Sequence, residues 1–404
     1  MLGGLPRRAS FIEQLRRERK NVLLVDTGDM LFSRPPAQGP YTKKMADLKT
    51  DLYMKTYNLM GYDAITPGEL DLFFRVDNVL QMSKQAFFPF LAANLIDTKS
   101  GKPVFKPYLI KEMPGIKVGL LGLISRRYPL GPPEEKEKYS LADPIERAQK
   151  IVPQLKKKKC QVIAVLGHME DDEKELLAKA VPGIHFILSG HNPNYYLQPM
   201  QANNSQIFVA GARGENLGKV DFLIEKKKLH SHYQLVALTS KYADHPQAQE
   251  MLNQYKTTLQ ELLRTSPQVG FRIRPKVAPR ETAVLSAPSF VGERVCLDCH
   301  QQEYQSWLTT SHASAYQTLA QQGKSSDPTC LACHSTGYGE SRNPPGISLE
   351  NVQCEACHGA GEGHPEPRKS LLRISENQCL KCHNPSNSPK FNYADYLQKI
   401  RHQK

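Results

Sequence analysis

The pattern of apolar and polar positions in the first 240 residues alternates between helix-like and strand-like stretches. Apolar residues recur at helical spacing in residues 7–20, 43–60, 143–157 and 173–180, with short apolar runs between them. These runs predict strands at residues 22–25, 62–66, 90–95, 118–124, 162–166, 184–188, 207–210, 220–224 and 233–238. Such alternation predicts a layered α/β domain over residues 1–240.

Beyond residue 240 this alternation stops. An apolar stripe predicts a helix over residues 246–264, and residues 266–288 are rich in Pro, Lys and Arg with little periodicity. We therefore expect residues 241–288 to form a helix and a linker, and residues 289–404 to form a mainly α-helical domain. The longest apolar run, Val118–Ile124, has the length of a strand, so we expect no transmembrane segment in this sequence.

The segment from residue 289 contains the pattern C-x-x-C-H four times. This pattern attaches c-type haem, because its two thiols reach the two vinyl groups of one porphyrin and the next His binds the iron. Paired zinc sites are the alternative, but zinc does not need a His directly after every second Cys. We predict four c-type haems, packed into this domain and tethered by Cys296, Cys299, Cys330, Cys333, Cys354, Cys357, Cys379 and Cys382. The predicted proximal ligands are His300, His334, His358 and His383.

Three further histidines in this segment, His312, His364 and His402, lie outside the four units. Four irons have four sixth coordination positions, and three imidazoles suffice for three of them. The count therefore predicts three haems with two axial histidines and one iron with an open or weakly held position.

Sequence around these units resembles the tetrahaem cytochrome c-554 family. The resemblance rests on Phe290-Val291-Gly292, Tyr304-Gln305-Ser306-Trp307, Ser311-His312-Ala313, residues 352–361 with His364, and the stretch from Phe391 to His402. It implies electron transfer, distal imidazoles at His312, His364 and His402, and a five-coordinate iron on His334. Redox catalysis on a small nitrogen or oxygen species at that iron is one alternative function.

Four polar residues, Asp29, Glu69, His168 and His191, lie at or near the carboxyl ends of predicted strands. Open α/β sheets gather their ligand sites at that edge. The first 240 residues also resemble the calcineurin-like metallophosphoesterases, most closely their 5′-nucleotidase branch. The matching stretches are residues 3–5, 24–29, 61–68, 92–95, 142–144, 166–168, 181–184 and 189–191.

That family clamps a phosphoryl group between two divalent metals, and only part of its ligand set is present here. Asp29, His168 and His191 match the family pattern. The D-x-H element before Gly3 is absent, G-N-H-E is replaced by Gly68-Glu69-Leu70-Asp71, and Pro193 replaces the last His of G-H-x-H. The resemblance thus implies a scaffold without hydrolysis. It leaves a site for one Mn, Zn or Fe ion at Asp29, Glu69, His168 and His191. The alternative is a metal-dependent nucleotidase with auxiliary haems.

Haem is attached to C-x-x-C-H units outside the cytoplasmic membrane, so the cofactor prediction implies a periplasmic or other extracytoplasmic protein. The sequence begins Met1-Leu2-Gly3-Gly4, without a charged n-region or an apolar h-region. We therefore expect the given N-terminus to lack its export signal.

The net charge of +13 lies entirely before residue 293, because residues 293–404 hold eleven basic and eleven acidic side chains. Haem propionates would make the second domain acidic, so the basic first domain predicts docking to it or to a redox partner protein. Aromatic and groove-reading residues typical of nucleic-acid binding do not accompany the basic runs.

Overall fold

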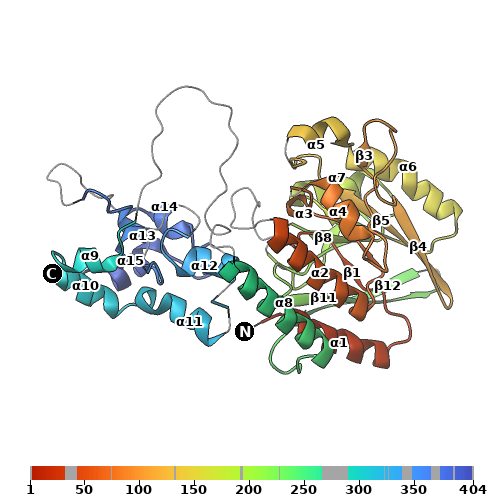
Figure 1. Cartoon of the computed structure of the whole chain (residues 1–404). Coiled ribbons are helices and arrows are strands. Elements are labelled where there is room, and N and C mark those ends of the chain that lie inside the picture. Colours follow the sequence, from red (N-terminus) through yellow and green to blue (C-terminus); the bar gives the residue numbers. More distant parts are fainter. Residues whose placement is uncertain are drawn as a thin grey trace. The chain divides into compact units, whose positions relative to one another are not determined.

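The computed structural model describes residues 2–31, 43–73, 75–131, 133–191, 194–226, 228–265, 290–322, 324–325, 327–338, 348–364, 374–384 and 387–402. The chain divides into a first unit that ends at Tyr255 and a second unit that begins at Lys256 (Figure 1). The predicted linker, residues 266–288, lies outside the described residues. The domain limits at residues 240 and 289 stay predictions.

The first unit contains both helices and strands, as the sequence pattern predicts. Its helices are α1 (Leu5–Glu18), α2 (Lys43–Met60), α3 (Glu69–Phe73), α4 (Val76–Ser83), α5 (Pro133–Lys138), α6 (Pro144–Lys157), α7 (Asp171–Ala180) and α8 (Pro246–Thr265), which runs into the second unit. Its strands are β1 (Val25–Asp26), β2 (Ala64–Ile65), β3 (Leu95–Asp97), β4 (Tyr108–Met113), β5 (Ile116–Ile124), β6 (Tyr139–Leu141), β7 (Val162–His168), β8 (Phe186–Gly190), β9 (Met200–Ala202), β10 (Ser205–Val209), β11 (Asn216–Glu225) and β12 (Lys228–Ala237).

A six-stranded sheet of order β4-β5-β7-β8-β10-β9 forms the centre of the first unit (Figure 1). Strands β5, β7, β8 and β10 are parallel, and both edge strands are antiparallel. Side chains of β7 alternate between two apolar clusters: Ile163 and Val165 pack with α6 and α7, whereas Val162 and Leu166 face β11 and β12. The predicted layered α/β fold is confirmed.

Two predicted strands are shorter or later in the chain than the pattern indicates. The run at residues 22–25 contributes only Val25 to β1, because the N–H of Leu24 donates to the Asp63 carboxylate at 2.9 Å instead of to a neighbouring strand. Residues 90 and 91 form single bridges, and regular pairing resumes only in β3. Apolar runs alone do not reveal where a backbone N–H donates to a side chain instead of to a neighbouring strand.

From residue 290 onward the described elements are helical, as predicted. They are α9 (Glu293–Leu297), α10 (Gln301–Leu308), the 3₁₀ turn η3 (Ser311–Ser314), α11 (Ala315–Gln321), α12 (Pro328–His334), α13 (Cys354–His358), α14 (Glu376–Leu380) and α15 (Tyr393–Ile400). Only five apolar side chains are buried in the described part of this segment: Phe290, Ala315, Leu319, Leu331 and Leu349. Across the described chain, no helix has the length and apolar character needed to cross a membrane.

Asn94 is expected to be a strong determinant of stability in the first unit. Its side chain is fully buried, donates to the carbonyls of Ile124 and Ala142 at 2.6 and 3.0 Å, and accepts from the Ile124 N–H at 3.0 Å. Asn94→Ala leaves these buried groups unpaired and should lower the free energy of unfolding by about 2–4 kcal/mol. Chemical denaturation with hydrogen exchange resolved along the chain measures this loss.

The matched control is Asn204→Ala, which truncates an exposed asparagine between β9 and β10. Equal midpoints for the two variants would contradict the role of Asn94.

Candidate functional site

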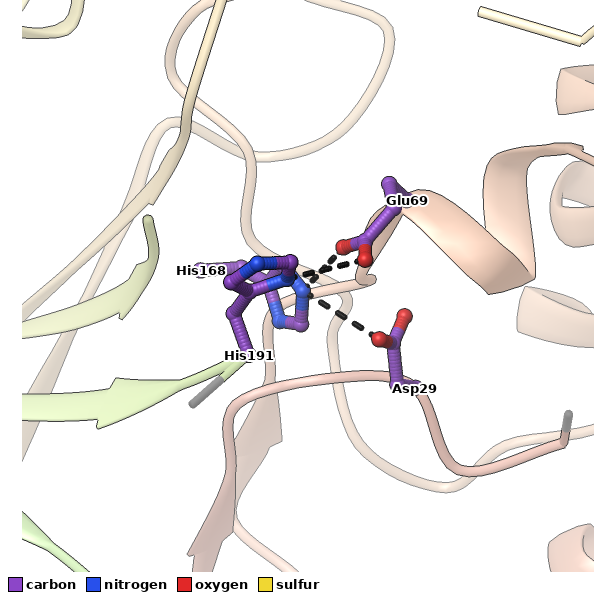
Figure 2. Close-up of side chains that lie close together, drawn as sticks. All are labelled: Asp29, Glu69, His168 and His191. Carbon is purple, nitrogen blue, oxygen red and sulfur yellow. Dashed lines mark hydrogen bonds and ion pairs between the residues drawn. The ribbon is translucent and has the colours of Figure 1, made fainter. Parts of the chain in front are cut away.

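Four potential metal ligands converge in the first unit. Asp29 follows β1, Glu69 begins α3, His168 ends β7 and His191 follows β8. Each offers one ligand atom, and these atoms all lie within 4.8 Å of one another. Figure 2 shows the four side chains pointing toward a common centre from four separate segments. The sheet edge thus brings together the four residues predicted from the sequence.

Glu69 bridges the two imidazoles. Its Oε1 accepts from Nδ1 of His191 at 2.9 Å, and its Oε2 contacts Nε2 of His168 (Figure 2). Nε2 of His168 also lies 3.4 Å from Oδ2 of Asp29. Because Nδ1 of His168 donates to the Thr27 carbonyl at 2.6 Å, Nε2 is the nitrogen that faces the cluster. Such a hydrogen bond on the second ring nitrogen is typical of metal-binding histidines.

The carboxylates and imidazoles of this cluster strongly shift one another's pKa values. Burial alone would lower the pKa of His168, but the carboxylates of Asp29 and Glu69 raise it well above its usual range. Burial would raise the pKa of Glu69, but its hydrogen bonds to His168 and His191 lower it far below the usual range. The same two imidazoles and two carboxylates match the ligand set of a divalent cation, which would take the place of the shared protons.

Backbone geometry holds two of these residues in an uncommon conformation. Asp29 has φ = 56° and His191 has φ = 77°, both in the left-handed region that few side chains adopt. Gly68 leaves the space beside Asp29 and His168, because a Cβ there would lie 2.1 Å from Oδ1 of Asp29 and 2.7 Å from Cε1 of His168. The close approach of the ligand loops therefore requires glycine at this position.

Asp71 supports the cluster, a role that the sequence patterns did not indicate. Its carboxylate is 1% exposed and accepts from the N–H groups of Asp29 at 2.9 Å and Gly68 at 3.0 Å. Burial, reinforced by the charge of Asp29, raises its pKa to about 7. The sequence signal that could have identified Asp71 is its position two residues after Glu69.

Tyr128 is a second neighbour that the sequence analysis missed. Its ring centroid lies 4.7 Å from that of His191 and 5.9 Å from that of His168. It comes from the loop after β5, where no sequence pattern marks it.

The positions where the family pattern is lost supply no imidazole in the described structure. Leu70 contacts the cluster through its backbone N–H, which donates to Oδ1 of Asp29 at 2.9 Å. Asn192 and Pro193 lie outside the described residues.

In the second unit each C-x-x-C-H unit forms one helical turn. The N–H of His300 donates to the Cys296 carbonyl at 2.9 Å, and the N–H of His383 donates to that of Cys379 at 2.8 Å. The other two units lie within α12 and α13. Helical spacing places the two thiols of each unit about one turn apart and the His directly after them.

Six of the seven histidines in this segment form three pairs of neighbouring rings, with interplanar angles of 23° for His300–His364, 48° for His312–His383 and 17° for His358–His402. His300 pairs with His364 and His383 with His312, each with ring centroids 6.1 Å apart, and His358 pairs with His402 at 6.3 Å. Each pair joins one His of a C-x-x-C-H unit to one His outside the units. His334 is the seventh, and its Nδ1 donates to the Ala315 carbonyl at 2.6 Å.

These spacings fit a shared metal. With a metal–nitrogen bond of about 2 Å on each side, two imidazoles on one metal have ring centroids about 6 Å apart. Because Nδ1 of His334 donates to Ala315 and Nδ1 of His383 hydrogen-bonds with Ser388 at 2.8 Å, Nε2 is the nitrogen of each ring that could bind a metal.

Comparison with known proteins finds similar proteins for both parts of the chain. Residues 295–359 match the family described as "Cytochrome c554 and c-prime". This match implies bound haem in the second unit.

The first unit resembles nucleotide phosphoesterases. The chain is 27% identical over 252 residues to the 2',3'-cyclic-nucleotide 2'-phosphodiesterase/3'-nucleotidase of Salmonella typhimurium, covering 55% of this chain and 39% of that protein. It is also 27% identical over 274 residues to the 5'-nucleotidase of Vibrio cholerae, covering 59% of this chain and 48% of that protein. The chain thus spans less than half the length of these two relatives.

A solved structure supports the same fold. The 5'-nucleotidase precursor from Thermus thermophilus superposes with a TM-score of 0.56 at 21% identity, over 65% of this chain and 54% of that one. The chain therefore combines a cytochrome c554-type segment with a 5′-nucleotidase-like α/β domain.

Without metal, the first unit should lose stability as pH rises. The raised pKa of His168 means that its protonated form stabilises the fold fully below pH about 6.5, and this contribution is lost as pH rises through the folded value. Asp71 acts in the same direction, because its folded pKa of about 7 lies above its unfolded value near 4. The stabilisation from its protonated form is therefore lost as pH rises from about 4 to 7. We expect a lower thermal midpoint at pH 8 than at pH 6 in EDTA, and Mn²⁺ or Zn²⁺ should reverse the loss.

His168→Asn should flatten this pH dependence, whereas His230→Asn, at an exposed position on β12, should leave it unchanged. A midpoint that stays constant or rises between pH 6 and 8 in EDTA would show that the cluster does not hold these protons.

Proposed function

We propose that the chain is an extracytoplasmic tetrahaem c-type cytochrome that transfers electrons, joined to a phosphoesterase-like domain that does not hydrolyse phosphate esters. The observation that carries this proposal is the set of three imidazole pairs with centroid distances of 6.1, 6.1 and 6.3 Å. Each pair would hold one haem iron, and His334 would hold the fourth. Haem, when bound, supplies the one-electron redox chemistry.

The chain's own residues hold and orient these groups. The eight cysteines would tether the porphyrins, and the Ala315 carbonyl and the Ser388 hydroxyl fix the ring orientations of His334 and His383. Two axial imidazoles favour low potentials relative to His–Met ligation, which suits exchange of electrons with a respiratory or other redox partner protein.

In this proposal the first unit binds one divalent ion and acts as a docking domain. Asp29, Glu69, His168 and His191 would hold Mn²⁺, Zn²⁺ or Fe²⁺ with two imidazoles and two carboxylates. Two-metal phosphoryl transfer needs a second ion beside the first, and Leu70 and Pro193 remove imidazoles that the family pattern places there. The net positive charge of this part favours an acidic partner.

The alternative, a metal-dependent phosphoesterase with auxiliary haems, is supported by the convergence of the four ligands within 4.8 Å and by the named activities of the relatives. A further alternative, reaction of a small nitrogen or oxygen species at an open iron, is supported by the position of His334 outside the three pairs.

Removing one distal ligand should change the spin state of one haem. The wild-type protein, produced in a host that matures c-type cytochromes, should carry the mass of four haems and show one high-spin centre by electron paramagnetic resonance. His364→Ala takes the second imidazole from the iron of His300 and should raise the count to two high-spin centres. Four haems with an unchanged spectrum in this variant would refute the pairing.

His245→Ala is the matched control, because His245 lies in the first unit before α8. In the same preparations, a high-spin signal that shifts with nitric oxide supports an open iron on His334, and four low-spin centres in the wild type exclude it.

Phosphate release separates the leading proposal from the phosphoesterase alternative. We expect no release from 5′- or 3′-nucleotides or 2′,3′-cyclic nucleotides with added Mn²⁺ or Zn²⁺, although the metal binds. Release that depends on metal and is abolished by His168→Ala would establish the alternative.

A further inference from the structure

Glu355 is a buried carboxylate in the second unit. It occupies the position directly after Cys354 within the third C-x-x-C-H unit, and only 2% of its surface is exposed. Carboxylates are rarely buried to this extent without a charged partner. Among the described residues, no Lys, Arg or His forms an ion pair with it.

Four hydrogen bonds from backbone N–H groups replace that partner. Oε1 accepts from Val291 at 2.9 Å and Gly361 at 2.6 Å, and Oε2 accepts from Gly292 at 2.8 Å and Val291 at 3.1 Å. These dipoles stabilise the ionised carboxylate without neutralising it with a full positive charge. The side chain therefore places a net negative charge inside the unit.

This charge lies between the first and third C-x-x-C-H units. Gly292 donates its N–H to Glu355 and accepts with its carbonyl from the thiol of Cys296 at 3.9 Å. Cys354 precedes Glu355 directly in the chain, and its sulfur atom lies close to that of Cys296.

We propose that Glu355 is an internal anion that lowers the reduction potentials of the two haems tethered by Cys296 with Cys299 and by Cys354 with Cys357. This inference rests on the proposed haem attachment. An oxidised haem carries one more positive charge than a reduced one, so a fixed anion nearby stabilises the oxidised state. The effect is large where the charge is shielded from water, as it is here.

The alternative is a purely structural role, in which Glu355 only ties residues 291, 292 and 361 together. A structural role predicts that any substitution that disturbs these contacts shifts the reduction potentials equally, whether or not it removes the charge. A role for the charge predicts that only its removal shifts the potentials.

Glu355→Gln tests the charge, because glutamine keeps the shape of the side chain. In protein shown by mass to carry four haems, the potentials of the haems on His300 and His358 should rise by the equivalent of about a tenfold change in the reduction equilibrium, which is about 59 mV for one electron. The other two haems should change much less. A redox titration followed by paramagnetic resonance resolves the individual haems.

Two variants serve as controls. Gly361→Ala keeps the charge but adds a Cβ that would lie 3.1 Å from Oε1 of Glu355 and 2.9 Å from Val291. Glu350→Gln removes an exposed carboxylate from the same unit. Both should leave the potentials near their wild-type values. A shift in Gly361→Ala equal to that in Glu355→Gln, or no shift in Glu355→Gln, overturns the inference.

If Glu355→Gln does not mature, the wild-type protein decides the question. The haems on His300 and His358 should then have lower potentials than the haem on His383, which also has two imidazoles in our assignment. Equal or higher potentials overturn the role of Glu355. A wild-type protein without attached haem would instead refute the proposed function.

Discussion

In our proposal the second unit depends on three pairs of imidazole rings whose centroids lie 6.1–6.3 Å apart, a spacing that leaves room for one metal ion between them. The three pairs have similar spacings although their members come from different segments of the chain. In the described part of this segment only five apolar side chains are buried, which is few for a stable domain core. Porphyrin fills this role in our proposal, because it is large, apolar and tethered through sulfur. Polar contacts of Gln353, Glu355 and Thr336 then connect the short helices.

The first unit has the opposite organisation. Two large apolar clusters flank a central sheet, so this unit is stable through its own side chains. Its polar cluster lies where the strands end and depends on positive charge, supplied by protons or by a metal, to hold two carboxylates and two imidazoles together. Asp29 and His191 have a left-handed backbone in a chain where Leu70 and Pro193 stand at ligand positions of the family pattern. The conformations of the ligand loops therefore do not require the complete set of family ligands.

The sequence predicts those parts of the structure that short-range patterns determine. The helix at residues 43–60 is long and strongly periodic, and its observed limits match the prediction. The four cluster residues could be grouped because parallel strands end at one edge of a sheet. Asp71 and Tyr128 were missed because their roles depend on tertiary contacts made across the cluster. The pairing of each distal His with its partner also depends on tertiary structure, since spacing along the chain does not order the pairs.

The hydrogen bonds of Glu355 have a consequence for biosynthesis. Residues 291–293, which lead into the first attachment turn, are held by Gln353 and Glu355 of the third. A nascent chain that has just exposed Cys296 and Cys299 therefore lacks the groups that later fix this turn, and closing the intervening loop costs entropy. The backbone of the first turn can therefore reach its folded conformation only after residues 353 and 355 have been synthesised.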